Sequence, residues 1–164
     1  MSIGEYRRVT AEEPERGRRD SDWTWNLVED VREAEEATEP PASVARYCHT
    51  YTAWAPLDVL LRRVGFPVDV THGEEELHGE GEVPGFFRYL PVQRVRCAAE
   101  AFSAMPYDRL IEGVDHGAVT DKGVGPFAGD SVKTLQWARH LYEGLVSFFE
   151  RAARDGHAVL VWQQ

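Results

Sequence analysis

Long apolar runs and a leader segment are both missing from this sequence. Its uninterrupted apolar stretches extend over only a few residues, far short of the roughly 20 that a helix needs to cross a bilayer. The first residues contain no basic segment followed by an apolar one, so we expect no secretory signal. These absences predict a cytoplasmic protein without a membrane-bound part.

Cysteine and lysine are both scarce. Cys48 and Cys97 are separated by a long stretch of sequence, and in a cytoplasmic protein we expect them to be buried thiols rather than a disulfide. Arginine outnumbers lysine by sixteen to two, a ratio typical of proteins from GC-rich bacterial genomes. The ratio indicates a bacterial source and leaves the function open.

A basic track is also lacking. The net charge of −10 comes from two acidic runs: residues 29–39 hold six acids and one arginine, and residues 69–82 hold six acids and no base. The rest of the chain carries a net charge of +1. Because nucleic acids are bound through positively charged surfaces, we expect no nucleic-acid partner. The two runs leave open a basic protein partner or plain solvated surface.

Motifs that carry catalysis or bind cofactors are missing as well. No serine or cysteine lies in a G-x-S-x-G elbow, and the glycine-rich segment 123–129 matches neither the dinucleotide nor the P-loop spacing. Asp115 and His116 place a carboxylate beside an imidazole, but catalysis needs a geometry that sequence neighbours rarely provide. The sequence favours a protein without enzymatic activity and without a cofactor.

The two ends of the chain carry the clearest structural patterns. Apolar residues recur with helical spacing over residues 130–154, and Asp155-Gly156 then separates this helix from an apolar strand at residues 158–162. Residues 3–9 have the pattern of a short half-buried strand. We predict an α+β fold over residues 1–164, a single domain in which several helices pack on a small sheet that includes the N-terminal and C-terminal strands.

The middle of the chain is interpreted from the same periodicities. Over residues 43–65, aromatic and aliphatic residues recur every three or four positions, which predicts an aromatic helix that Pro56 kinks or restarts. Residues 67–85 contain glycines, prolines and the second acidic run, so we expect an exposed acidic loop. Residues 86–90 then have the pattern of an edge strand or an extended segment, and a helix opened by Pro91 follows.

Several segments together resemble the YfbM-like family of bacterial domains of unknown function. They are residues 3–6 with 10–13, the aromatic segment with Trp54 and Leu60-Leu61, residues 87–91 before the Val95 helix, and residues 148–162. The resemblance covers nearly the whole chain, apart from Pro56 and residues 15–41, and implies an α+β fold with both terminal segments in the sheet. It transfers no catalytic or binding residue. Some small acidic bacterial domains of this kind look like immunity or antitoxin proteins, which implies a protein partner.

The acidic loop supplies the first candidate binding residues. Glu74, Glu75 and Glu76 are consecutive carboxylates in a segment that we expect to be exposed. Such a cluster is complementary to a basic surface. We predict that these three glutamates contact a basic protein partner and that the protein is a non-catalytic interaction domain.

The aromatic segment supplies the alternative, a small-molecule site or an enzyme. Tyr47, Tyr51 and Trp54 would form the walls of a pocket on one side of the predicted helix, and Asp58 would add a polar group. His49 falls on another side of that helix. The same aromatic residues would also fit a plain hydrophobic core, so this alternative requires a deep pocket that reaches Trp54 and has converging polar groups.

Metal binding and self-association are two further options. His72 and His78 lie among the glutamates of the acidic loop, but their spacing matches no known metal site. We expect no metal, and these two histidines would be the ligands if one binds. Trp23 and Trp25 cannot both face the same helical core, so their exposed flank is a candidate homodimer contact. The sequence leaves monomer and homodimer open.

Overall fold

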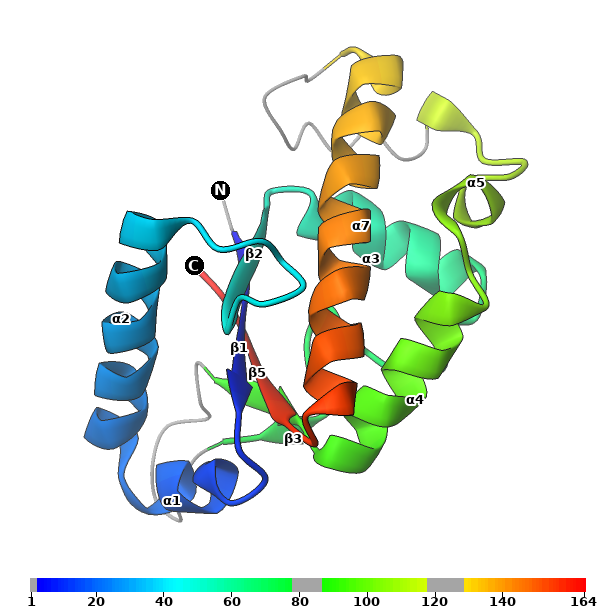
Figure 1. The fold of residues 1–164 in the computed structure, drawn as a ribbon. Coiled ribbons are helices and arrows are strands. Elements are labelled where there is room, and N and C mark those ends of the chain that lie inside the picture. The colour runs from blue at the N-terminus through cyan, green and yellow to red at the C-terminus, as the bar shows by residue number, and fades with distance from the viewer. Residues whose placement is uncertain (1–2, 78–86, 118–128) are drawn as a thin grey trace.

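The computed structural model describes residues 3–77, 87–117 and 129–164, and helices pack on both faces of a small sheet (Figure 1). Within these residues the sheet has five antiparallel strands in the order β2-β1-β5-β4-β3. The strands are β1 (Gly4–Val9), β2 (Tyr47–Tyr51), β3 (Glu75–Glu76), β4 (Arg88–Leu90) and β5 (Ala158–Gln163). The helices are α1 (Glu13–Arg19), α2 (Ser21–Thr38), α3 (Trp54–Arg63), α4 (Val92–Ser103), α5 (Tyr107–Leu110) and α7 (Ser131–Arg154). The predicted α+β fold, with the first and last strands in the sheet, is confirmed.

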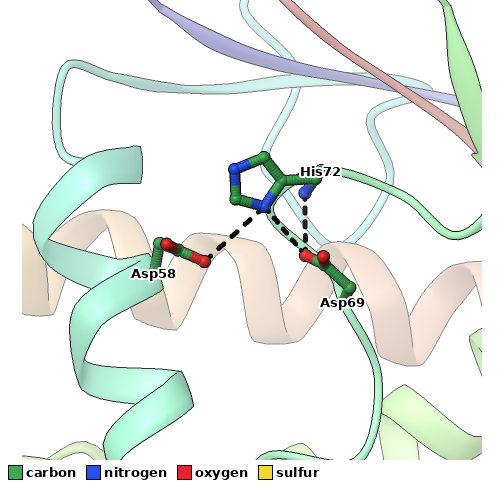
Figure 2. Close-up of side chains that lie close together, drawn as sticks. All are labelled: Asp58, Asp69 and His72. Carbon is green, nitrogen blue, oxygen red and sulfur yellow. Dashed lines mark hydrogen bonds and ion pairs between the residues drawn. The ribbon is translucent and has the colours of Figure 1, made fainter.

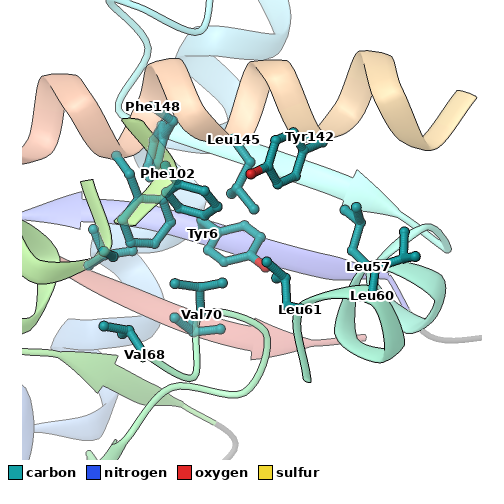
Figure 3. Packing of buried hydrophobic residues seen from close by; sticks show 14 of the residues in the cluster. Tyr6, Leu57, Leu60, Leu61, Val68, Val70, Phe102, Tyr142, Leu145 and Phe148 are labelled. Atoms are coloured by element: carbon teal, nitrogen blue, oxygen red, sulfur yellow. The ribbon is translucent and has the colours of Figure 1, made fainter. Parts of the chain in front are cut away.

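The larger hydrophobic core lies between the sheet and helices α3, α4 and α7 (Figure 3). Tyr6, in the middle of β1, is fully buried there, with its ring 6.4 Å from that of Phe148 and 6.2 Å from that of Phe149. These two phenylalanines come from α7, the long helix that the sequence predicts, and Asp130 caps its start by accepting a hydrogen bond from the backbone of Lys133. The last helix and the last strand are therefore part of the core, as expected.

The opposite face of the sheet packs against α2 and carries more polar groups. Val9, Val28, Leu160 and Trp162 form a smaller apolar cluster there. Because side chains alternate along a strand, Glu5 also lies on the Val9 face, where Glu5 is paired with Trp162 of β5 and His49 of β2. This face places a buried acidic group in the middle of the sheet.

The predicted aromatic helix over residues 43–65 is wrong in its first half. Tyr47–Tyr51 form strand β2, Val44 is 51% exposed, and the helix starts only at Trp54. A positive φ of 45° at Tyr51 ends the strand. Pro56 then lies in the first turn of α3, where its missing N–H needs no helical partner.

The predicted exposed loop and edge strand are also corrected. In residues 67–77, the described part of the acidic loop, Val68, Val70, Thr71 and Leu77 are buried. Glu75 and Glu76 form the short strand β3, which covers the outer side of β4. The segment expected as an edge strand is therefore an inner strand, because β4 also pairs with β5.

Candidate functional site

A cleft of about 900 Å³ lies along the outer edge of β2, between the C-terminal part of α2 and the middle of α7. Three parts of the chain that are distant in sequence meet there because α2 and α7 lie on opposite faces of the sheet and β2 is its last strand (Figure 1). The lining comprises the residue before β1 and residues of β1, α2, the segment after α2, β2 and α7: Ile3, Glu5, Glu35, Glu36, Glu39, Pro40, Ala42, Ala45, Tyr47, Cys48, His49, Tyr51, His140, Leu141, Glu143, Gly144 and Ser147.

The lining is strongly acidic. Among the described residues it contains five glutamates and neither lysine nor arginine: Glu5, Glu35, Glu36, Glu39 and Glu143. Arginines flank the cleft at contact distances of 3.8–4.0 Å from Glu35, Glu36 and Glu143. Glu5 and Glu39 form no ion pair within the described residues. The cleft thus combines a negative field with two carboxylates that lack a cationic partner there.

Glu5 is the most buried of these acids. Its side chain comes from the inner strand β1, and the residue is only 5% exposed. The hydroxyl of Tyr47 donates a 2.5 Å hydrogen bond to Oε1 of Glu5, whereas Oε2 has no hydrogen-bond partner among the described residues. The neighbouring Nδ1 of His49 is likewise buried and unpartnered within the described part of the chain. A buried acceptor pair therefore lies at the inner end of the cleft.

Burial also sets the protonation of the groups around Glu5. It lowers the pKa of His49, partly offset by the charges of Glu5 and Glu36, so the imidazole is neutral at pH 7. Burial and the hydrogen bond to Glu5 raise the pKa of Tyr47, which keeps its hydroxyl as a donor. Burial raises the pKa of the Cys48 thiol to about 12, and a protonated thiol is a poor nucleophile.

Tyr47 and Tyr51 are the two predicted pocket residues that line the cleft. The ring of Tyr51 packs edge-on against His49, at 4.1 Å between centroids, and Tyr51 is 48% exposed. His49 joins them because these residues form a strand and not a helix. Residues two apart along a strand point to the same face, which places His49 beside Tyr47 and Tyr51. A cleft thus lies beside Tyr47 and Tyr51, but Trp54, which the predicted pocket has to reach, is not among its described lining residues.

Trp54 and Asp58 lie elsewhere, at the start of α3. The indole of Trp54 is edge-on to the ring of His72, at 5.8 Å. Asp58 accepts hydrogen bonds from Arg62 and from the hydroxyl of Thr71. The four predicted pocket residues are therefore divided between two places on the molecule.

The comparisons with known proteins agree with this fold. A family model described as a domain of unknown function (DUF1877) matches residues 1–162. The chain belongs to this family. The crystal structure of YfbM from Escherichia coli, a protein of unknown function, superposes with a TM-score of 0.59 at 16% sequence identity and covers 99% of both chains. A search of curated proteins finds no match.

Membership of the DUF1877 family supports the predicted resemblance and the fold. At 16% identity the YfbM structure bears on the fold alone, and both the family and the YfbM structure are described as of unknown function. A fold alone does not specify a function, which depends on the side chains of the site.

The three predicted contact residues of the acidic loop each pair with an arginine. Glu74 is 2.6 Å from Arg94 of α4, Glu75 is 3.3 Å from Arg18 of α1, and Glu76 is 3.3 Å from Arg88 of β4. Glu75 also accepts a hydrogen bond from the hydroxyl of Tyr89. These contacts offset the negative charge of the segment locally. Contact of Glu74, Glu75 and Glu76 with a basic partner stays a prediction.

The cleft residues that were not predicted come from the first acidic run, from β1 and from α7. Glu35, Glu36 and Glu39 belong to the run at 29–39, which was recognised as a charged patch. Glu5 carried a weaker signal, a charged residue within a predicted strand. Nothing in the sequence indicates that Glu143 of α7 lies opposite these groups.

His72 belongs to a cluster with Asp58 and Asp69 (Figure 2). Its Nδ1 is 3.1 Å from Asp69 and 3.6 Å from Asp58, and these donor types suit transition metals. Arg62 lies in the same cluster, with Nε 2.9 Å from Asp58 and Nη2 3.9 Å from Asp69. The guanidinium thus already supplies positive charge to both carboxylates. His78, the second predicted ligand, lies outside the described residues.

Two further expectations concern association and membranes. Trp25 is 39% exposed with its ring 4.9 Å from that of Phe87, and the guanidinium of Arg16 covers Trp23 at 4.5 Å. A homodimer through this flank stays a prediction. Among the described helices, none has the length and apolar character to cross a membrane. Both Cys48 and Cys97 are free.

Proposed function

We propose that this DUF1877 protein is a non-catalytic binding protein whose cleft between α2, β2 and α7 accepts a positively charged segment of a protein partner. The observation that carries the proposal is the lining of the cleft, which has five glutamates and no lysine or arginine in the part of the chain that the structure describes. Clustered charge of one sign attracts and orients a partner of the opposite sign. An immunity-like role, with a basic protein as the partner, would be one form of this function.

The position of the cleft favours an extended segment. β2 is the outermost strand of the sheet on this side, and an edge strand can pair with an added extended peptide. Tyr47 and Tyr51 place aromatic rings beside the glutamates, and aromatic faces attract arginine and lysine side chains. A basic extended peptide would use all three features.

The groups of the cleft support binding more than catalysis. Among the described residues, the cleft contains one aliphatic hydroxyl group, that of Ser147, and one thiol, that of Cys48. Neither forms a hydrogen bond with a histidine side chain or a carboxylate there, and burial keeps the thiol of Cys48 protonated at neutral pH. A nucleophile needs a neighbouring base or a lowered pKa.

The test is binding of a fluorescein-labelled arginine–serine dodecapeptide, with the citrulline–serine peptide as the uncharged control. In one variant Glu36, Glu39 and Glu143, which line the cleft and are exposed, are changed to glutamine. The matched control changes Glu100, Glu112 and Glu150, which are exposed and away from the cleft. Both variants lose the same charge.

We expect the cleft variant to bind at least about tenfold more weakly at low salt, and the control variant to differ from the wild type by less than about twofold. Citrulline peptide should not bind. Equal losses of peptide affinity in the two variants would show that binding depends on the net charge of the protein and not on the cleft, which would contradict the proposal. An absence of binding to the wild type would refute it as well.

A second candidate is a small cationic molecule in the same cleft, as the aromatic-pocket hypothesis suggests. The volume of about 900 Å³ is in the range of ligand sites. Titration with spermidine separates the two: tighter binding of spermidine than of the peptide would favour the small molecule.

A further inference from the structure

The environment of Glu5 is unusual for a structural carboxylate. The residue is 5% exposed, yet one of its two oxygens accepts no hydrogen bond within the described chain. Leaving a buried acceptor unpaired is unfavourable, and more so for a charged group. Such a group in a fold is an indication of a ligand.

The neighbouring cation does not neutralise Glu5. Arg7 lies two residues along β1 on the same face and is 3% exposed. Its guanidinium donates to the backbone carbonyls of Leu27 and Arg8. The one side chain that donates to Glu5 among the described residues is the uncharged Tyr47.

The groups beside Glu5 that face the cleft are also acceptors or aromatic rings. His49 is its partner across the strands, with an unpartnered buried Nδ1. Because His49 is neutral, Nδ1 can accept a hydrogen bond in the tautomer with the proton on Nε2. The rings of Tyr47 and Tyr51 flank the imidazole at 5.9 Å and 4.1 Å. A ligand that fits these groups must donate hydrogen bonds and carry positive charge.

We infer that Glu5 is the counter-ion for a single cationic head group, a primary ammonium or a guanidinium, that enters the cleft alongside Tyr47, His49 and Tyr51. One N–H donates to Oε2 of Glu5 and a second to Nδ1 of His49, while the tyrosine rings contact the alkyl stem and the charge. The inference rests on the proposed function and adds to it the residue that selects the head group. Glu36, Glu39 and Glu143 attract the ligand, and Glu5 selects a cationic head group over a neutral one.

The same head group can come from a peptide side chain or from a free amine. The probes are therefore N-acetyl-lysine methylamide, its Nε-acetylated neutral counterpart, and agmatine as a free guanidinium compound. Each is titrated into the 15N-labelled protein, and amide chemical shifts are followed. We expect the lysine probe and agmatine to shift the amides of Glu5, Tyr47 and His49, and the acetylated probe to have no effect.

The deciding variant is Glu5→Gln, which keeps the size of the side chain and an acceptor for Tyr47 but removes the charge. We expect it to weaken lysine-probe binding at least about tenfold, the scale of a lost charge-assisted hydrogen bond. The control Glu36→Gln, at the exposed side of the cleft, should weaken the same binding less than about threefold. The thermal unfolding of both variants is compared first.

The outcomes separate this inference from the proposed function. If the arginine–serine peptide and the lysine probe bind Glu5→Gln as well as the wild type, the role of Glu5 is refuted and the acidic cleft stands. If no cationic probe binds the wild type, both are refuted. If Glu5→Gln fails to fold, the wild-type shift map decides: shifts away from Glu5, Tyr47 and His49 refute the inference. Tighter binding of the peptide than of agmatine assigns the head group to a partner protein.

Discussion

Both carboxylate oxygens of Glu74 accept hydrogen bonds from Arg94, 2.6 Å from Nε and 2.8 Å from Nη2. A backbone N–H at Asp69 also donates to Glu74, and Arg94 donates to the carbonyl of Pro67. The glutamate that sequence analysis places in an exposed loop therefore ties that loop to α4.

We expect Glu74→Gln to destabilise the fold by about 1 kcal/mol, because it breaks a two-point ion pair that is only partly screened by solvent. The matched change Glu76→Gln should cost less than about 0.5 kcal/mol, since the side chain of Glu76 is 48% exposed and that of Glu74 only 26%. Urea unfolding followed by circular dichroism measures both. Equal costs would contradict the structural role of Glu74.

The pH dependence of this pair has a definite sign. Arg94 lowers the pKa of Glu74 below its ordinary 4.5, so the unfolded state binds the proton more readily. The stabilisation is complete above pH 4.5 and is lost as the pH falls through the lower pKa of the folded state. The difference in unfolding free energy between wild type and Glu74→Gln should therefore shrink between pH 6 and the acidic limit of folding.

Tyr47→Phe should cost about 1–3 kcal/mol, because it leaves the buried Oε1 of Glu5 without its donor. Tyr51→Phe is the control: Tyr51 is 48% exposed, and a cost below about 0.5 kcal/mol is expected. In a Glu5→Leu background the Tyr47→Phe change should be nearly neutral, and an unchanged cost there would show that the hydroxyl acts through something other than Glu5. Chemical denaturation of the four variants gives these values.

Gly4→Ala should destabilise the sheet by about 1–3 kcal/mol through overpacking. A Cβ at Gly4 would lie 2.6 Å from Oγ1 of Thr50 and 2.8 Å from Cβ of Trp54. Gly144→Ala is the contrasting variant. Gly144 lies inside α7, and the nearest described atom to an added Cβ would be the Cβ of Ala42, at an ordinary contact distance of 3.9 Å. Helix propensity therefore predicts a gain in stability of about 0.5–1 kcal/mol. Thermal unfolding distinguishes the two, and a shared sign would refute the packing argument.

Burial lowers the pKa of both His49 and His157 in the folded protein. At pH values between these lowered pKa values and the ordinary 6.5, the two histidines are protonated in the unfolded chain but not in the folded chain. The free energy of unfolding should therefore fall as the pH drops from 7 towards 5.5. The double variant His49→Gln/His157→Gln should show a flatter slope in that window and the wild-type slope above pH 7.5. Urea midpoints across this range test it, and parallel curves throughout would contradict the burial effect.

The ends of the chain were predictable because their patterns are long and have a single interpretation. Tyr142, Leu145 and Phe149 recur on one face of α7 over several turns, and Ala158–Gln163 is too apolar and too short for anything but a buried strand. The segment around Tyr47 was ambiguous. Tyr47 and Tyr51 are four apart, which suits one face of a helix and equally one side of a strand, and here the strand-forming Tyr-Cys-His-Thr-Tyr sequence pairs with β1.

The candidate site was only partly predictable for a different reason. The aromatic residues Tyr47 and Tyr51 and the first acidic run were recognised, but a cleft is made by residues that meet through topology. Glu5, Tyr47 and Glu143 come from three distant segments, and no local spacing connects them. The same holds for Arg18, Arg88 and Arg94, whose contacts with Glu75, Glu76 and Glu74 balance charges that appear unpaired along the sequence.

The position of β5 has a consequence for the order in which the molecule can assemble. β5 pairs with β1 on one side and with β4 on the other, so the pairs β1–β2 and β3–β4 are joined only through it. Residues 158–163 follow all the other described strands along the chain, so they are synthesised after them. Until β5 is available, β1 and β4 each lack one neighbouring strand, and the sheet of the described residues closes only when β5 inserts between them.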